Sequence, residues 1–379
     1  MSHPKTEIRS YIPVNTPLFR GNEKKYLNEC IDMGWISSEG AFVKKFEEAF
    51  SQYSNRKYGI AVANGSAALD IAVKAAGIGQ GDEVIMPTFT IISPAFSVMR
   101  VGATPVYIDS EEDTWNMYAE DIERKITEKT KAIIVVHIYG LPANMERVME
   151  IARKHELIVI EDAAEMHGQT CNGQRCGSFG DISTFSFYAN KVITTGEGGM
   201  VVCNDEKIAE KCRQYRNLSF VPDKRRFIHY ETGWNYRMTN MQAAVGLAQL
   251  EQITDFIEKK RAIGAFYRRE LAFLTDHGFQ LPLKSTDYAE NIYWVFGLIA
   301  PDEAEKERVI RYLEDHAIGT RPFFWCMHEQ PLYADSLVAS QHFPVAEKMA
   351  RRGFYIPSGL GIKEEEMQIV VSAFRQLYG

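Results

Sequence analysis

The runs KAIIVV (residues 131–136) and LIVIED (residues 157–162) decide the fold class of this 379-residue chain. Each run is short and almost wholly apolar, and an amphipathic stretch separates the two. Continuous apolar runs of this kind are typical of strands that a parallel sheet buries on both faces. The two runs therefore predict neighbouring parallel strands of an α/β fold.

The same alternation extends outward from about residue 57 to residue 205. We expect helices from Ser66 and near Ser93, between further apolar runs: KYGIAVA (57–63), EVIM (83–86) and TPVYI (104–108). Strands that alternate with helices imply βαβ units and a mainly parallel sheet. We therefore predict a large α/β domain over residues 1–250.

The pattern changes between residues 238 and 274, where apolar residues recur at helical spacing in a long segment rich in Ala, Leu, Glu and Lys. IYWVFGLIA (292–300) then predicts a strand, and residues 303–320 and 363–378 predict amphipathic helices. We expect a smaller α+β domain over residues 251–379, joined to the large one without a Pro-rich linker.

Composition excludes several classes of protein. The formal net charge is −7, whereas a nucleic-acid binder needs a concentrated basic surface. The opening residues have no apolar signal core, and no run is long enough to cross a bilayer, so we expect a cytoplasmic protein. The six cysteines form no CxxC pair, and we predict neither a metal site nor a disulfide framework.

Asp162 ends the run LIVIED, at the sheet edge where open α/β sheets bind ligands. One interpretation is structural: the carboxylate caps a helix or joins a buried ion pair. The other is functional, because a carboxylate there can pair with the ring nitrogen of a pyridine cofactor and keep that ring protonated.

Lys191 lies in DISTFSFYANKVITTGEGGMVV (181–202), between an apolar strand and a glycine-rich turn. Lysines are usually solvated surface charges. This one has Ser186 on one side and Gly196, Gly198 and Gly199 on the other, a context that favours an amine that forms an imine with a bulky cofactor.

Gly65 and Ser66, in VANGSAALDIAV (62–73), follow a strand and open a helix. Free N–H groups and the positive end of the helix dipole make such a position a phosphate seat. The alternative is an ordinary turn with Ser66 as the helix N-cap.

Seven motifs in this order resemble those of the DegT-type sugar aminotransferases, a family of fold type I enzymes that use pyridoxal 5′-phosphate (PLP). The likeness runs from about residue 12 to the end of the chain. The motifs are NGSAAL (64–69), GDEVIMPTFT (81–90), VHIYG (136–140), IEDAAE (160–165), FSFYANK (185–191), TTGEGG (194–199) and NYRMTN (235–240).

The resemblance implies roles for individual residues. Lys191 matches the lysine that forms an imine with the cofactor, and Asp162 matches the acid on the pyridine nitrogen. Glu165 matches a position near the ring hydroxyl. Gly65, Ser66 and Ser186 match the phosphate seat, and Asn235 matches a residue that reaches the cofactor phosphate of a neighbouring subunit. A homodimer or higher oligomer with shared active sites is thus expected.

Two positions depart from the family pattern. Ile91 stands where the family usually has Tyr or Trp, which puts aromatic stacking on the cofactor ring in doubt, although an aliphatic side chain can still cover that face. In KRRFIHYETGWNYRMTN (224–240) the Arg-Tyr-Trp run of relatives that act on GDP-sugars is missing.

The resemblance implies amine transfer from L-glutamate, through pyridoxamine 5′-phosphate, to a nucleotide-linked keto sugar. We expect GDP-4-keto-6-deoxymannose, aminated at C4, in a surface-polysaccharide pathway such as that of O-antigen; a UDP- or dTDP-linked sugar is the alternative. Arg237, Arg321 and His328 are candidate diphosphate partners, or else surface or interface charges. Trp35 and Ser37 line the sugar pocket, or else form a packed turn.

Three other functions compete with this one. A related sugar dehydratase has His in place of the lysine, and Lys191 argues against it. A non-catalytic regulator on the same fold is expected to lose Lys191 or Asp162, and both are present. A Rossmann dehydrogenase needs an early glycine fingerprint that the chain lacks.

Overall fold

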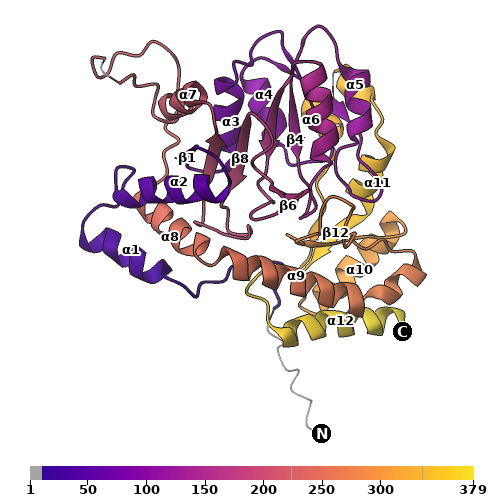
Figure 1. Ribbon diagram of the computed structural model, residues 1–379. Helices are drawn as coiled ribbons and strands as arrows, with labels where there is room; N and C mark the ends of the chain where they lie inside the picture. The colour runs from indigo at the N-terminus through magenta and orange to yellow at the C-terminus, as the bar shows by residue number, and fades with distance from the viewer. Residues whose placement is uncertain (1–10, 223, 335) are drawn as a thin grey trace.

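A computed structural model describes residues 11–222, 224–334 and 336–379 (Figure 1). The opening residues, on which the prediction of no signal segment rests, lie largely outside this part. No helix in the described ranges combines the length and apolar character needed to cross a membrane.

The larger sheet has seven strands within the described residues, and β9 runs antiparallel to the other six. The predicted α/β fold with a mainly parallel sheet is confirmed. The sheet order is β1 (Tyr58–Val62), β9 (Gly199–Cys203), β8 (Ile182–Ser186), β5 (Ile158–Asp162), β4 (Thr130–Val136), β2 (Glu83–Pro87) and β3 (Thr104–Ile108).

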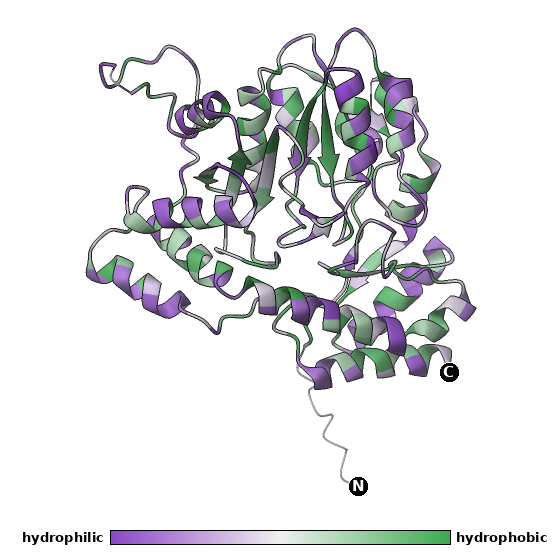
Figure 2. Ribbon diagram, viewed as in Figure 1, coloured by the Kyte–Doolittle hydropathy of each residue, from purple (hydrophilic) through white to green (hydrophobic). Residues whose placement is uncertain are grey.

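Helices from the first part of the chain surround this sheet; α3 contacts both β8 and β9, whereas α1 packs against α8. Their bounds are α1 (Glu23–Asp32), α2 (Ala41–Tyr53), α3 (Gly65–Ala75), α4 (Ser93–Arg100), α5 (Ile122–Lys125), α6 (Met145–Lys154), α7 (Glu206–Arg216) and α8 (Asn240–Leu250). Figure 2 shows the sheet in the colours of hydrophobic residues, while the helices carry hydrophilic stripes on their outer faces. The core therefore lies along the sheet, as the apolar runs require.

The predicted helical segment 238–274 is two helices, α8 and α9 (Ile253–Glu270), with a turn at residues 251–252. The smaller sheet is antiparallel, in the order β10 (Phe296–Ile299), β12 (Gly353–Ile356), β11 (Arg321–Pro322). The helices of this later part of the chain include α10 (Glu303–Asp315), α11 (Pro344–Arg352) and α12 (Glu364–Tyr378). A separate two-stranded hairpin is formed by β6 (Thr170–Cys171) and β7 (Gln174–Arg175).

Buried apolar side chains form two clusters. One surrounds the large sheet and also takes in Phe323, Tyr333 and Phe343 from the later part of the chain. The other joins α9, α10 and α12 to the small sheet, with Tyr267, Phe354 and Phe374 fully buried. Figure 1 shows α9, α10 and α12 side by side below the large sheet. The chain between residues 323 and 350 thus contributes to the core of the large sheet as well.

Candidate active site

A cavity of about 580 Å³ opens at the carboxyl ends of β4, β5 and β8. This is the edge where open α/β sheets bind ligands. Seven of the residues predicted to hold the cofactor line the cavity: Gly65, Ser66, Ile91, Asp162, Glu165, Ser186 and Lys191.

Asp162 is the last residue of β5 and is 3% exposed. Its Oδ1 atom accepts a hydrogen bond from the Ala164 amide at 3.1 Å. Burial raises the pKa of this carboxyl, while the Ala164 amide and the charge of Lys191 act in the opposite direction. Burying a charged carboxylate costs free energy unless the charge is paired. Asp162 is therefore placed to pair with a cationic group in the cavity.

Lys191 lies in the turn after β8, where its amide donates to the Tyr188 carbonyl at 2.9 Å. Its Nζ atom is 4.0 Å from the centroid of the Trp294 ring and 3.7 Å from Oε1 of Glu165. Burial lowers the pKa of this amine, and the charges of Glu165 and Asp162 oppose that shift. A lysine whose pKa is lowered by burial is the kind that forms imines with carbonyl groups.

Glu165 is held by the backbone as well as by charge. Its Oε2 atom accepts from the Tyr139 amide at 2.7 Å, and burial raises the pKa of the carboxyl. Tyr139 belongs to the motif VHIYG, so the loop after β4 fixes the acid that faces Lys191.

Gly65 and Ser66 open α3, but the N-cap is Asn64 and not Ser66. The Asn64 side chain accepts from the Ala67 amide at 2.8 Å, which corrects the alternative in which Ser66 itself caps the helix. The hydroxyl of Ser66 instead contacts the Ser93 hydroxyl at 2.7 Å. The first amides of a helix have no intrahelical acceptor. Together with these hydroxyls they form a corner rich in hydrogen-bond donors.

Three aromatic side chains from the later part of the chain line the cavity and were not identified from the sequence: Trp294, Phe324 and Tyr355. They come from residues far along the chain that join the wall only when the small sheet packs against the large one. Trp294 lies in IYWVF, which predicts only a buried strand, although its Nε1 donates to the Asn190 carbonyl beside Lys191 at 2.9 Å. His137 of VHIYG also lines the cavity, and its place directly after a buried strand was a usable signal.

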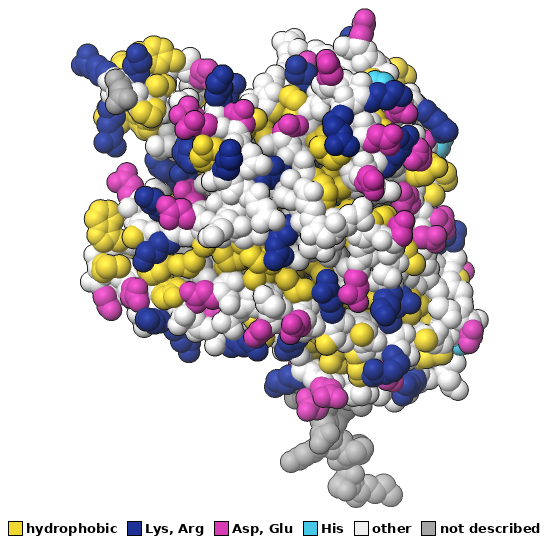
Figure 3. Space-filling view, viewed as in Figure 1, with side chains coloured by type: hydrophobic (Ala, Val, Ile, Leu, Met, Phe, Trp, Pro, Cys, Tyr) yellow, Lys and Arg dark blue, Asp and Glu magenta, His cyan; other side chains and the backbone are white. Residues whose placement is uncertain are grey.

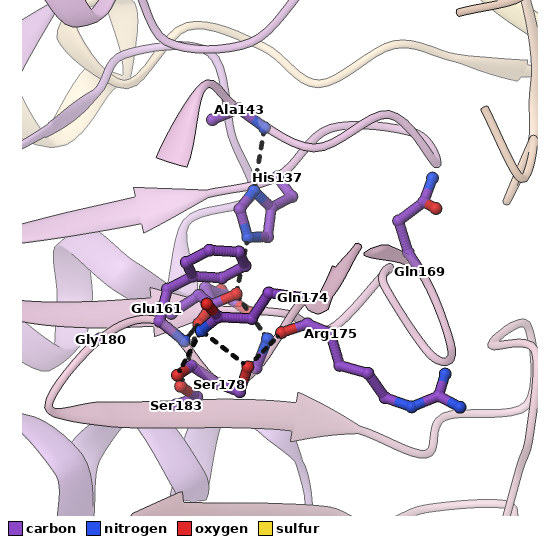
Figure 4. A network of polar contacts seen from close by, with 12 residues as sticks. His137, Ala143, Glu161, Gln169, Gln174, Arg175, Ser178, Gly180 and Ser183 are labelled. Carbon is purple, nitrogen blue, oxygen red and sulfur yellow. Dashed lines mark hydrogen bonds and ion pairs between the residues drawn. The ribbon is translucent and has the colours of Figure 1, made fainter. Parts of the chain in front are cut away.

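Glu161, the residue before Asp162, belongs to a buried polar network (Figure 4). Glu161 is fully buried, and its carboxylate contacts His137 Nε2 at 3.1 Å and accepts from the Phe179 amide at 3.1 Å. The Nδ1 atom of His137 accepts from the Ala143 amide at 3.1 Å, so Nε2 carries the proton that Glu161 receives. The network therefore fastens the loop after β5 to the loop after β4.

Asn235 and Arg237 do not line this cavity. Asn235 is exposed and its backbone pairs with Asn217, while Arg237 donates to the Asn217 side chain and lines a second cavity of about 440 Å³. Ser38, Arg213 and Arg216 line that second cavity too.

Trp35 and Ser37 are exposed. Asn240 donates to both of their carbonyls: its side-chain Nδ2 to Trp35 at 2.6 Å and its backbone amide to Ser37 at 2.9 Å. The backbone of this turn is thus fixed, while both side chains are exposed. Arg321 is exposed on β11, directly opposite Tyr355 of the cavity wall.

His328 is 1% exposed and lies outside the cavity wall. Its Nδ1 atom contacts the Thr88 hydroxyl at 2.8 Å and its Nε2 contacts Glu347 at 3.2 Å. Both nitrogens are occupied, so the geometry corrects its expected role as a diphosphate partner.

The residues of the cavity fit PLP. A planar pyridine with a phosphate, an aldehyde and a ring nitrogen needs a donor-rich corner, an amine and a carboxylate, and α3, Lys191 and Asp162 supply them in one space. A Cβ atom on Gly65 would lie 2.8 Å from Cβ of Ser186, so the phosphate corner requires glycine there.

The comparisons with known proteins agree with this geometry. The model of the DegT/DnrJ/EryC1/StrS aminotransferase family matches residues 18–375. The chain belongs to this family. A GDP-perosamine synthase of Escherichia coli O157:H7 is 43% identical over 368 residues, which cover 97% of this chain and 99% of that protein. Another protein of that name, from Vibrio cholerae, is 40% identical over 370 residues, 97% and 99% of the two chains.

Among solved structures, S. venezuelae DesV in complex with a ketimine intermediate has a TM-score of 0.87, 31% identity and 94% coverage of both chains. As a member of the DegT/DnrJ/EryC1/StrS family, the chain is a PLP-dependent sugar aminotransferase of fold type I. Its substrates are a nucleotide-linked sugar and an amino donor.

Proposed function

We propose that the chain transfers an amino group from L-glutamate to C4 of GDP-4-keto-6-deoxy-D-mannose and forms GDP-perosamine. The single observation that carries the proposal is that two relatives named GDP-perosamine synthase are at least 40% identical along almost their whole length. Lys191 and Asp162 in one cavity support the chemistry.

When bound, PLP supplies an aldehyde that receives the amino group and a ring that accepts electrons from the bonds at the amine-bearing carbon. In our proposal Lys191 holds the aldehyde through Nζ and, once released, takes and returns a proton at the amine-bearing carbon. Support comes from burial, which lowers the pKa of this amine and so makes its proton easier to transfer.

The other side chains orient the ring. Asp162 keeps the pyridine nitrogen protonated, and its fixed place at the end of β5 supports this role. Glu165 faces the ring hydroxyl, Ile91 covers one face of the ring, and Gly65, Ser66 and Ser186 hold the phosphate. Trp294 lies beside the Lys191 amine, where it excludes water from one side.

We further propose a homodimer or higher oligomer in which Asn235 and Arg237 act on the partner's cavity. Their absence from this chain's own cavity wall supports the idea, as does the second, arginine-rich cavity. Exposed apolar side chains lie at the end of α1 and directly after it: Ile31, Met33, Trp35 and Ile36 (Figure 3). Such a patch is typical of an interface, and in the dimer Trp35, Ser37 and Arg321 would meet the nucleotide sugar.

The division into residues 1–250 and 251–379 also stays a proposal, supported by the second apolar cluster around α9, α10 and α12. A cytoplasmic location and a place in surface-polysaccharide synthesis, such as that of O-antigen, follow from the proposed nucleotide-sugar substrate.

The test is the visible absorption of the purified protein with PLP. We expect an imine band that disappears with L-glutamate and returns with GDP-4-keto-6-deoxymannose, and Lys191→Ala to lack the band. Lys44→Ala, at an exposed lysine of α2, is the matched control. If the band returns with a UDP- or dTDP-linked keto sugar instead, the substrate carries that nucleotide and not GDP. A wild type without an imine band would favour the non-catalytic regulator.

A further inference from the structure

Lys260 is a buried lysine that the proposed chemistry does not use. It lies on α9 and is 2% exposed, whereas most lysines are solvated. Its Nζ atom donates to the carbonyl of Ser358, and none of the salt bridges among the described residues includes it. Burial lowers the pKa of Lys260 to about 7. Burying an amine without a carboxylate is costly, so its place calls for a function.

A small cavity of about 10 Å³ separates Lys260 from the turn that carries Lys191. Lys191 and Asn190 line the cavity together with Lys260, and so does Trp294. That volume is at the lower limit of what one water molecule needs. Lys260 and the turn that carries Lys191 therefore line one shared space.

Asn190 is the link between the two lysines. Its carbonyl accepts from Asn15 Nδ2 at 3.2 Å and from Trp294 Nε1 at 2.9 Å. Its Oδ1 atom is buried and has no partner among the described residues. An ammonium group has three donors, and the bond to Ser358 uses one. Lys260 thus has donors left, and Asn190, which lines the same small cavity, has an acceptor that lacks a donor.

Three segments far apart in sequence meet at this point. The Ser358 amide donates to the Val14 carbonyl at 3.1 Å, and the Gly361 amide donates to the Thr16 carbonyl at 2.8 Å. Lys260 adds α9 to this junction through the Ser358 carbonyl. Through Asn15 the same junction reaches Asn190, the residue before Lys191.

We propose that Lys260 is a positioning residue for the reaction: it donates across the small cavity to Asn190 Oδ1, through one water, and so holds the turn that aims Lys191 into the active site. The inference rests on the proposed role of Lys191. It assigns Lys260 no contact with substrate or cofactor.

Lys260→Met tests this inference, because it keeps the apolar stem and removes the donors. Lys306→Met is the matched control, since Lys306 is also buried, lies on α10 and forms a salt bridge with Glu307. Three quantities are measured for each variant with PLP: the pH midpoint of the lysine–cofactor imine band, kcat and KM with L-glutamate, and the Tm of the apo protein.

We expect Lys260→Met to move the imine midpoint and to lower kcat about tenfold with little change in KM, since a misaimed reacting group costs rate more than binding. Lys306→Met is expected to move only Tm. The inference is overturned if Lys260→Met keeps the wild-type midpoint and kcat, even with a lower Tm.

Should Lys260→Met not fold, Lys260→Gln takes its place, because it retains a donor while its shorter side chain cannot cross the cavity. The imine midpoint and kcat of this variant are then compared with those of the wild type in the same way. A failure of the role of Lys191 is recognised separately: Lys191→Ala then still forms the imine band, or the wild type never forms one.

Discussion

Oε1 of Glu165 lies 3.7 Å from Nζ of Lys191, while Oε2 of the same carboxylate accepts the Tyr139 amide at 2.7 Å. The backbone thus holds a negative charge beside the amine. Burial lowers the pKa of Lys191, and the charge of Glu165 raises it. The reactivity of the amine depends on the balance between these two effects.

Glu165→Gln removes the charge and keeps the shape. We expect the pKa of Lys191 to fall, because a neutral amide no longer favours the ammonium form, so the imine with PLP forms at lower pH than in the wild type. The pH dependence of imine formation, followed by visible absorption, measures the change. Glu197→Gln, at an exposed carboxylate of the same cavity, is the control. A midpoint that stays in place or rises contradicts the prediction.

Glu161→Gln is expected to destabilise the fold in a pH-dependent way. Burial alone would raise the pKa of Glu161, but hydrogen bonds from His137 and from the amides of Gly177 and Phe179 lower it overall. A carboxyl with a lowered folded pKa stabilises the protein above its unfolded pKa, about 4.3, and loses that contribution as the pH falls through the folded value. We expect a loss of about 3 kcal/mol at pH 7.

Urea unfolding of the apo protein at pH 7 and at pH 4 measures this loss, which should shrink at the lower pH. Glu150→Gln, at an exposed carboxylate paired with Arg147, is expected to change stability by about 0.5 kcal/mol or less. An equal loss at both pH values would argue that packing, rather than the charge of Glu161, holds the loop.

The strands and the residues at their carboxyl ends could be predicted from the sequence because their signals are local. The run LIVIED fixes both β5 and the position of Asp162, and the strand before FYANK fixes the place of Lys191. A buried strand reveals itself by its apolar run, and the sheet edge then follows from the parallel order.

The remainder of the site depends on contacts that no local pattern encodes. Trp294 and Tyr355 reach the cavity only because the small sheet packs against the large one. Histidine is a residue type that can bind phosphate, yet Thr88 and Glu347 contact both ring nitrogens of His328. Residue type alone could not reveal that these partners, distant in sequence, would be present.

Gly65→Ala is expected to weaken PLP binding about tenfold. The added Cβ would lie 2.8 Å from Cβ of Ser186, an atom fixed by β8, so the phosphate corner has to open. Fluorescence titration of the apo protein with PLP gives the Kd. Gly79→Ala is the matched control, because a Cβ there meets nothing within 4 Å. If the two variants bind PLP equally well, the corner formed by Gly65 and Ser186 does not hold the phosphate.

Ile91→Phe is expected to slow the loss of PLP about three- to tenfold, because an aromatic ring that stacks on another adds about 0.5–1.5 kcal/mol. Ile91 lines the cavity and is 48% exposed, so the larger ring has room without repacking the core. The rate at which PLP leaves the holoenzyme into an excess of a second apo acceptor gives the measurement.

Ile91→Leu separates stacking from mere contact, since it conserves volume and apolar character and should release PLP at the wild-type rate. Slower release from the Phe variant alone would mean that residue 91 covers the cofactor ring, and that the wild type does so with an aliphatic group. If neither variant changes the rate, another wall of the cavity covers that face, and Trp294 and Phe324 are the aromatic side chains to vary next.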